Sequence, residues 1–207
     1  MGAGAGEAGQ AGGGGVRRGR PWGESVPPPV GLVSIGSDVA TAAEARSDLP
    51  VRLTAGDVLS SLGGPSVGPL VNRFAIDVLR VRADDDELVA IAHVVVRGRT
   101  WWRGPVTAVL NVDRLGRWDA APRAHPGDGR FDVVEVDAAM SLRARWQARR
   151  RLPSGTHVPH PLIRTSQHTT ASWAFAPERR LWLDGIARGP VHELEVTIEP
   201  AGAIVYT

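Results

Sequence analysis

The residues whose spacing most suggests chemistry lie in the loop at 121–132, which reads Ala-Pro-Arg-Ala-His-Pro-Gly-Asp-Gly-Arg-Phe-Asp. Pro122 and Pro126 fix the backbone torsion φ at two points, and the glycines on both sides of Asp128 tolerate positive φ. A loop stiffened in this way can hold a carboxylate and main-chain carbonyls around one point, which suits a hard cation that prefers oxygen ligands. The alternative is that Asp128 and Gly129 form only a tight hairpin turn.

A second set of residues could contact a lipid surface. It combines tryptophans with the arginines of one predicted helix: Trp101, Trp102, Trp146, Arg143, Arg145, Arg149, Arg150 and Arg151. Each arginine close to an anionic membrane adds on the order of 1 kcal/mol of attraction. The alternatives are an ordinary solvated helix face and a tryptophan pair half-buried at the end of a strand.

Two segments about fifty residues apart resemble the C-terminal half of the bacterial diacylglycerol kinase and sphingosine kinase superfamily. The first is 121–136, where Ala-Pro-Arg and Asp-Gly precede Phe-Asp-Val-Val, and the second is 181–186, Leu-Trp-Leu-Asp-Gly-Ile. Weaker similarities follow in the family's order at 109–116, 151–157 and 200–205. The resemblance covers about two thirds of the chain and implies the β-rich second domain of such a kinase.

This resemblance assigns roles to two aspartates. In the family the loop holds a structural magnesium, which implies Asp128 as the side-chain ligand here, with the main chain of His125 and Arg130 beside it. The aspartate of the family's Asp-Gly-Glu turn lies at the active cleft, which implies Asp184 as the general base that takes a proton from a lipid hydroxyl. Ile186 stands where the family has glutamate, so the supporting carboxylate is missing. The alternative for Asp184 is that it only starts a turn.

Kinases of this family bind ATP through a Gly-Gly-Asp-Gly-Thr loop, and this chain contains no such string. Because phosphoryl transfer depends on positioning nucleotide and metal, we do not expect the chain alone to bind ATP or to act as a kinase. We expect a non-catalytic or partner-dependent module that binds a glycerolipid or another long-chain lipid. One alternative is half of a split lipid kinase, completed by a separate ATP-binding chain. Another is a structural remnant used for protein–protein contact.

Short strands and turns dominate the elements that must position these residues. Apolar runs predict strands at 30–35, 74–81, 88–96, 106–112, 130–136, 162–167, 171–175, 181–183, 194–198 and 203–205. The segment from Ala138 to about Leu152 has no Gly or Pro and predicts a helix, and shorter helical segments are expected at 40–46 and 54–62. The pattern favours one mainly β, β-sandwich-like domain over 31–207. Residues 1–30, rich in Gly, Ala and Pro, predict a disordered tail.

Composition narrows the possible partners and location. The chain has 207 residues and a formal net charge of +2, and all 24 of its basic residues are arginine. A net charge this small does not favour nucleic acid as a partner. The absence of cysteine excludes disulfides and thiolate chemistry, and no segment is apolar enough for a membrane span or a secretion signal. We therefore expect a cytoplasmic protein that is at most peripheral at the inner membrane face.

Overall fold

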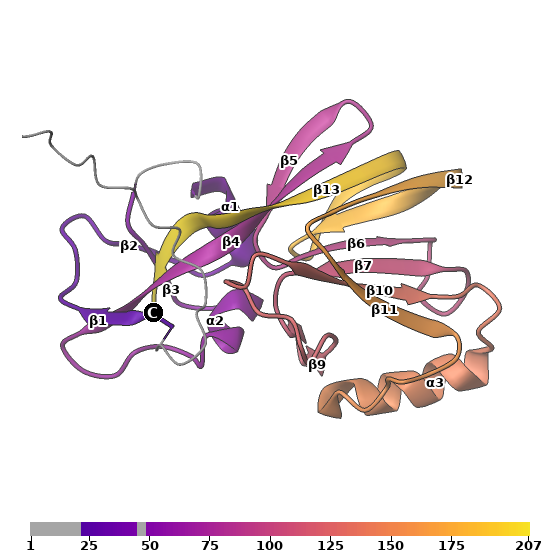
Figure 1. Cartoon of the computed structure of the whole chain (residues 1–207), viewed down its shortest axis with the longest axis horizontal. Coiled ribbons are helices and arrows are strands. Elements are labelled where there is room, and N and C mark those ends of the chain that lie inside the picture. The colour runs from indigo at the N-terminus through magenta and orange to yellow at the C-terminus, as the bar shows by residue number, and fades with distance from the viewer. Residues whose placement is uncertain (1–21, 45–48) are drawn as a thin grey trace, which may run out of the picture.

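The computed structural model describes residues 22–44 and 49–207 (Figure 1). The strands are β1 (Glu24–Val26), β2 (Val33–Ile35), β3 (Val51–Leu53), β4 (Val71–Ala83), β5 (Asp86–Ala90), β6 (His93–Arg97), β7 (Val106–Leu110), β8 (Arg114–Leu115), β9 (Trp118–Asp119), β10 (Phe131–Val136), β11 (Ile163–His168), β12 (Thr170–Leu183) and β13 (Ile186–Tyr206). The helices are α1 (Asp38–Glu44), α2 (Asp57–Ser61) and α3 (Leu142–Arg151), which the short 3-10 turn η1 (Leu152–Ser154) follows.

Eleven of these strands belong to one sheet that folds over on itself. Its main path runs β1-β4-β13-β12-β6-β7-β10-β11, with β5 paired to β4, and with β2 and β3 joined to β13 by parallel pairing. In Figure 1 β13 and β12 lie above β6, β7 and β10, β4 crosses diagonally to the left of these strands, and α3 lies below them. One apolar cluster takes residues from all of these strands, so the mainly β, sandwich-like prediction is confirmed.

Strands β7 and β10 bury both of their faces. Successive side chains of a strand point to opposite faces of the sheet. Val109 and Val133 therefore pack inside the sandwich, whereas Ala108 and Val134 pack on the outer face, in a second cluster shared with α3. This double burial is why both strands carry adjacent apolar residues, at Ala108–Leu110 and Val133–Val134, in place of a strict alternation.

Helix α3 begins at Leu142, four residues after the predicted start. The hydroxyl of Ser141 accepts a hydrogen bond from the N–H of Ala144 (3.3 Å) and so caps the helix. Before it, residues 137–140 form a turn in which the N–H of Met140 donates to the carbonyl of Asp137 (3.1 Å). Most of the helix's arginines point to solvent, but Arg145 is fully buried.

The single strand predicted at 88–96 is wrong. The apolar run is divided at Ile91 and Ala92, so that β5 pairs with β4 whereas β6 pairs with β12 and β7. Both residues at the break are fully buried, yet their N–H groups leave the sheet ladder. Buried amides need an acceptor, and here a side chain from a distant turn supplies it, which no periodicity in the run itself could indicate.

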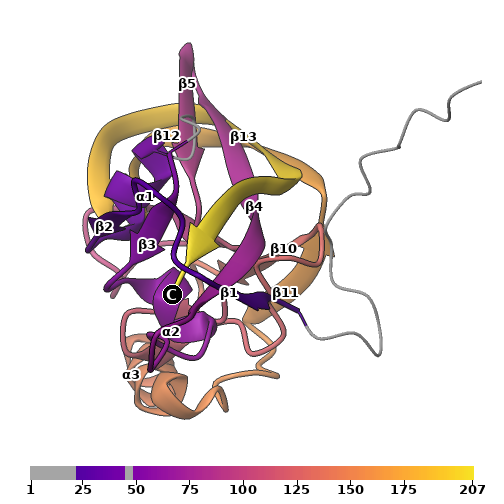
Figure 2. The same ribbon diagram turned by 90° about the vertical axis from the view of Figure 1, so that its left-hand side faces the viewer.

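The predicted tail covers residues 1–30, but a strand lies within its last part. Residues 24–26 form β1, which pairs antiparallel with β4 (Figure 2). The ring of Trp22 packs 5.0 Å from that of Phe74, which offsets the entropy cost of fixing this segment. The rest of the predicted tail, residues 1–21, lies outside the described residues.

Candidate functional site

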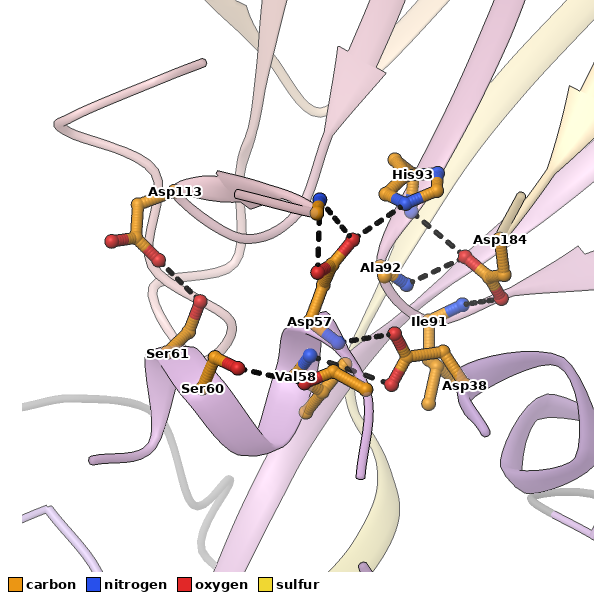
Figure 3. A network of polar contacts seen from close by, with 12 residues as sticks. Asp38, Asp57, Val58, Ser60, Ser61, Ile91, Ala92, His93, Asp113 and Asp184 are labelled. Atoms are coloured by element: carbon orange, nitrogen blue, oxygen red, sulfur yellow. Dashed lines mark hydrogen bonds and ion pairs between the residues drawn. The ribbon is translucent and has the colours of Figure 1, made fainter. Parts of the chain in front are cut away.

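Asp184, the predicted base, lies in the turn between β12 and β13 with a positive φ of 46°. Its Oδ1 accepts hydrogen bonds from the N–H groups of Ala92 (3.0 Å) and His93 (2.8 Å), and its Oδ2 accepts one from Ile91 (3.0 Å; Figure 3). In return, the N–H of Asp184 donates to the carbonyl of His93 (2.9 Å). The carboxylate thus satisfies the amides at the break between β5 and β6.

This engagement limits what Asp184 can do chemically. Burial raises the pKa of its carboxyl, and the hydrogen bonds from the backbone oppose that rise because they favour the charged form. A general base needs a lone pair aimed at the proton that it removes. Of about four lone-pair sites on a carboxylate, three here already accept backbone N–H groups. Ile186 is half exposed in the same turn and brings no second carboxylate.

The same corner contains a buried polar network that the sequence analysis missed (Figure 3). The Nε2 of His93 lies 3.0 Å from Oδ2 of Asp57, whose carboxylate also accepts the N–H of Gly116 (2.9 and 3.0 Å). Asp38, from α1, accepts the N–H groups of Asp57 (2.6 Å) and Val58 (3.4 Å). The first turn of α2 is therefore capped by another helix and tied to β6.

The network shifts the pKa of each of its titratable groups, and only the contacts with His93 favour the charged forms of both partners. Burial raises the pKa of Asp38 to about 6. Burial also disfavours charge on Asp57, but the hydrogen bonds from His93 and Gly116 outweigh it and lower the pKa of Asp57. For His93, burial is outweighed by the hydrogen bond to Asp57 and by the nearby carboxylates, so its pKa is raised. The one sequence signal was that His93 interrupts an otherwise apolar run at 88–96.

The predicted magnesium loop is a turn with one exposed carboxylate. The Oδ1 of Asp128 accepts the N–H of Arg130 (3.0 Å), and the carbonyl of His125 accepts the N–H of Gly127 (2.8 Å). Within the described residues, no group of three or more His, Cys, Asp or Glu side chains is arranged to hold a metal. The oxygens that remain are one from Asp128 and backbone carbonyls, which fit a cation that keeps several of its waters, as Mg²⁺ does.

Asp77, which the sequence analysis also missed, fastens this loop to the sheet. Its carboxylate is buried and accepts the N–H groups of Gly129 (2.7 Å) and Ala201 (2.8 Å), while its own N–H donates to the carbonyl of Pro126 (2.7 Å). The amide of Asn111 donates to the carbonyl of Asp77 (2.9 Å). Burial raises the pKa of Asp77, and its backbone hydrogen bonds oppose that rise.

An apolar cavity of about 510 Å³ lies between α3 and the outer face of β6, β7 and β10. Its volume is within the range of roughly 300–1,000 Å³ that small-molecule sites occupy. The wall is formed by apolar side chains from the sheet and the helical segment: Val95, Val106, Ala108, Leu110, Val134, Val136, Met140, Ala148, Leu152 and Ile163. Arg97, Thr100, Trp102 and Arg149 line its more exposed side, and no residue that lines it is acidic.

Arg145 holds the rim of this cavity in place. It donates hydrogen bonds to the carbonyls of Met140 (3.1 Å), Trp101 (2.8 Å) and Asp137 (2.9 Å), and a further one to that of Gly104. A single buried guanidinium thereby ties the 101–104 turn and the 137–140 turn to α3. Burial lowers its pKa, and the charge of Asp137 opposes this change.

Arg149, one helical turn further on, has a different environment. Its guanidinium carbon lies 5.5 Å from the ring centre of Trp102 and 5.0 Å from that of Trp118. Trp101 lies beside both rings, at centroid distances of 5.6 and 6.5 Å. Three of the predicted lipid-contacting residues, Trp101, Trp102 and Arg149, thus meet at the cavity.

The other predicted lipid contacts lie on α3 away from the cavity, except that Arg145 is buried, so its prediction as a lipid contact is wrong. Trp146 is 50% exposed, and the guanidinium of Arg150 lies 4.8 Å from its ring centre. Leu142, which was not predicted, is 51% exposed beside them. Arg143 is exposed on the same helix. Asp184 lines none of this cavity, so the predicted base and the apolar site are separate features.

Comparison with known proteins supports the fold alone. No protein-family model matches the sequence, and no curated protein is similar enough in sequence to match it. Three solved structures from Bacillus anthracis str. Sterne are similar in fold: two are titled as "a putative diacylglycerol kinase" and one as a diacylglycerol kinase. They are 10%, 11% and 11% identical to this chain, with TM-scores of 0.60, 0.61 and 0.52. The matches cover 84% of this chain and 77%, 77% and 75% of theirs.

This chain therefore has a diacylglycerol-kinase-like fold. The resemblance first noted in the two Asp-Gly segments is confirmed at that level. Among the described residues, no helix is long and apolar enough to cross a membrane.

Proposed function

We propose that the chain is a lipid-binding module of the diacylglycerol-kinase-like fold, corresponding to the β-rich, substrate-side domain of such kinases and without catalytic activity of its own. The observation that supports this most directly is the apolar cavity beneath the outer face of β7 and β10. The cavity has the volume of a small-molecule site, and its wall is apolar. Its exposed side carries tryptophan and arginine, which suit the place where an acyl chain joins a head group.

The engagement of Asp184 supports a non-catalytic role. Its carboxylate is occupied by the backbone of Ile91, Ala92 and His93, so it is poorly placed to accept a proton from a lipid hydroxyl. Phosphoryl transfer would need a nucleotide site and a base besides Asp184.

The outer face of α3 supports delivery of the module to a membrane. Leu142 and Trp146, one helical turn apart, expose apolar area on the same side, and Arg143 and Arg150 flank them. Exposed apolar side chains among arginines are typical of a surface that rests on anionic lipid. We propose that this face lies on the membrane while the cavity beside it receives the lipid.

Extraction of the purified protein with organic solvent, followed by mass spectrometry, tests this function. We expect a long-chain lipid to co-purify with the natural chain. Ala108→Phe, which fills the cavity from the middle of β7, should abolish the co-purified lipid. Ala174→Phe, on an exposed position of β12, is the matched control and should retain it. Recovery of the same lipid from both variants would place its binding site outside the cavity.

A further inference from the structure

We infer that the cavity selects anionic amphiphiles, single-chain lipids with a carboxylate or phosphate head, and that Arg149 binds the head group. This inference rests on the lipid-binding function proposed above. It goes beyond that function because an apolar cavity alone would accept a neutral chain equally well.

The charged residues that line the cavity are all basic. Two arginines, Arg97 and Arg149, line it, and no acidic residue does. The guanidinium of Arg97 already has partners, since it lies 3.9 Å from the ring centre of Trp182 and donates to the carbonyls of Gly98 and Arg99. Arg149 is therefore the cation at this cavity with the least competition for its hydrogen-bond donors.

The guanidinium of Arg149 lies over two rings, 5.5 Å from the centre of Trp102 and 5.0 Å from that of Trp118. These cation–π contacts attract the charge but supply no oxygen acceptor to the N–H groups. Its N–H donors lie along the edge of the plane. Among the described residues, these donors have neither a hydrogen-bond acceptor nor an acidic partner, in contrast to Arg80 and Arg82, which pair with glutamates of β13.

The free N–H groups of Arg149 suit an anionic ligand. A guanidinium donates two parallel N–H groups to the two oxygens of a carboxylate or phosphate. The indole N–H of Trp101, which also lines the cavity, is buried without an acceptor among the described residues, so a ligand oxygen would satisfy it as well. An alcohol or ester head group satisfies these donors less well, because it carries no charge.

Calorimetric titration with decanoate, decyl phosphate and decanol, each below its micelle or solubility limit, tests this inference. For the natural chain we expect both anions to bind at least tenfold more tightly than decanol, which corresponds to about 1.4 kcal/mol. Arg149→Gln should remove that difference and leave the affinity for decanol unchanged, which also shows that the cavity is folded. Arg150→Gln, on the same helix with a similar tryptophan contact, is the matched control and should keep the difference.

Several outcomes would overturn the inference. If decanol binds the natural chain as tightly as decanoate, the preference for anions is wrong and the lipid-binding function stands. If none of the three probes binds, both are wrong. If Arg149→Gln keeps the preference, or if inorganic phosphate alone binds as tightly as decyl phosphate, Arg149 is not the head-group ligand of an amphiphile.

Discussion

The Nε2 atom of His93 lies 3.0 Å from Oδ2 of Asp57, and this pair joins the start of β6 to the first turn of α2. Both side chains are largely buried, at 4% and 16% exposure. The contact joins the sheet to α2, so it adds to the apolar packing of Val58 and Leu59 in holding that helix.

Raising the pH should weaken this contact. Burial is outweighed by the hydrogen bond to Asp57 and by the charges of Asp57, Asp184 and Asp38, so the pKa of His93 is raised above 6.5. The stabilisation is therefore complete below pH 6.5 and is lost as the pH rises through the raised value. We expect the free energy of unfolding, measured with urea, to fall as the pH rises above about 6.5 in the natural chain.

His93→Gln isolates the titration. Glutamine can still donate to Asp57 but carries no charge, so its unfolding free energy should stay level over the same pH range. Asp38, with a pKa of about 6, and His157, whose pKa is lowered by burial, titrate below this window. An equal decline in both proteins would assign the effect to another group.

Loss of the Asp184 carboxylate should destabilise the fold. Asp184→Ala leaves the buried N–H groups of Ile91, Ala92 and His93 without an acceptor, at a cost of about 2–4 kcal/mol. Asp84→Ala is a matched control, because Asp84 also has a positive φ (50°) and accepts backbone N–H groups, but is exposed. We expect its cost to be below about 1 kcal/mol, since water replaces the carboxylate. Equal costs in urea unfolding would contradict the anchoring role.

Arg145→Met should also be costly. The substitution removes the hydrogen bonds that the guanidinium donates to four carbonyls. Because these carbonyls lose their donor, we expect the free energy of unfolding to fall by about 3 kcal/mol or more. Arg143→Gln, two residues earlier and exposed, should change stability by no more than about 0.5 kcal/mol. If the two variants unfold at the same denaturant concentration, the buried arginine is not what holds the rim of the cavity.

Magnesium should stabilise the chain through the 121–132 loop. Binding to the folded state alone raises the free energy of unfolding by about 1.4 kcal/mol at ten times the dissociation constant. We expect the melting temperature to be higher in magnesium than in chelator for the natural chain, and Asp128→Asn to remove the difference. Identical melting temperatures in both buffers would mean that the loop is only a turn.

The exposed face of α3 should bind anionic vesicles. Arg143→Gln combined with Arg150→Gln removes about 2 kcal/mol of attraction, or roughly thirtyfold in affinity. Salt screens charges over about 8 Å at physiological ionic strength, so raising the salt concentration should also lower the affinity of the natural chain for anionic vesicles. Ile186→Ala is the control, because Ile186 is as exposed as Leu142 and Trp146 but lies on the sheet, away from α3. It should not change the amount of protein that sediments with the vesicles. Equal binding to neutral and anionic vesicles would exclude the electrostatic contribution.

The sequence was sufficient for most of the long strands and for α3 because local patterns carry that information, whereas β1, β3 and the break between β5 and β6 were not predicted. Alternation and apolar runs at β7, β10 and β13 reflect faces that are buried in the fold. Trp101, Trp102 and Arg149 of the cavity were also identified, but neither their grouping nor the part played by Trp118 and Arg97 was. Whether Arg149 or Arg145 is buried depends on which side of α3 meets the sheet, and neighbouring arginines at 143–151 give no periodicity that distinguishes them.

The polar network could not be predicted because its partners are distant in sequence. Asp184 reaches residues more than ninety positions earlier, and Asp38 caps a helix nineteen positions later. Such bonds depend on how the sheet folds over, which is decided by many contacts together. The family resemblance drew attention to Asp184 as a base, whereas the geometry gives it an acceptor's role toward the backbone.

The bond pattern of Asp184 also bears on how kinase-like sequences are classified. The carboxylate at this turn has a structural role, since the corner between β5 and β6 would otherwise bury unpaired amides. Substitution of Asp184 would therefore destabilise the fold whether or not the protein transfers phosphate. An Asp-Gly pair at this corner serves the architecture, and its presence is no measure of enzymatic turnover.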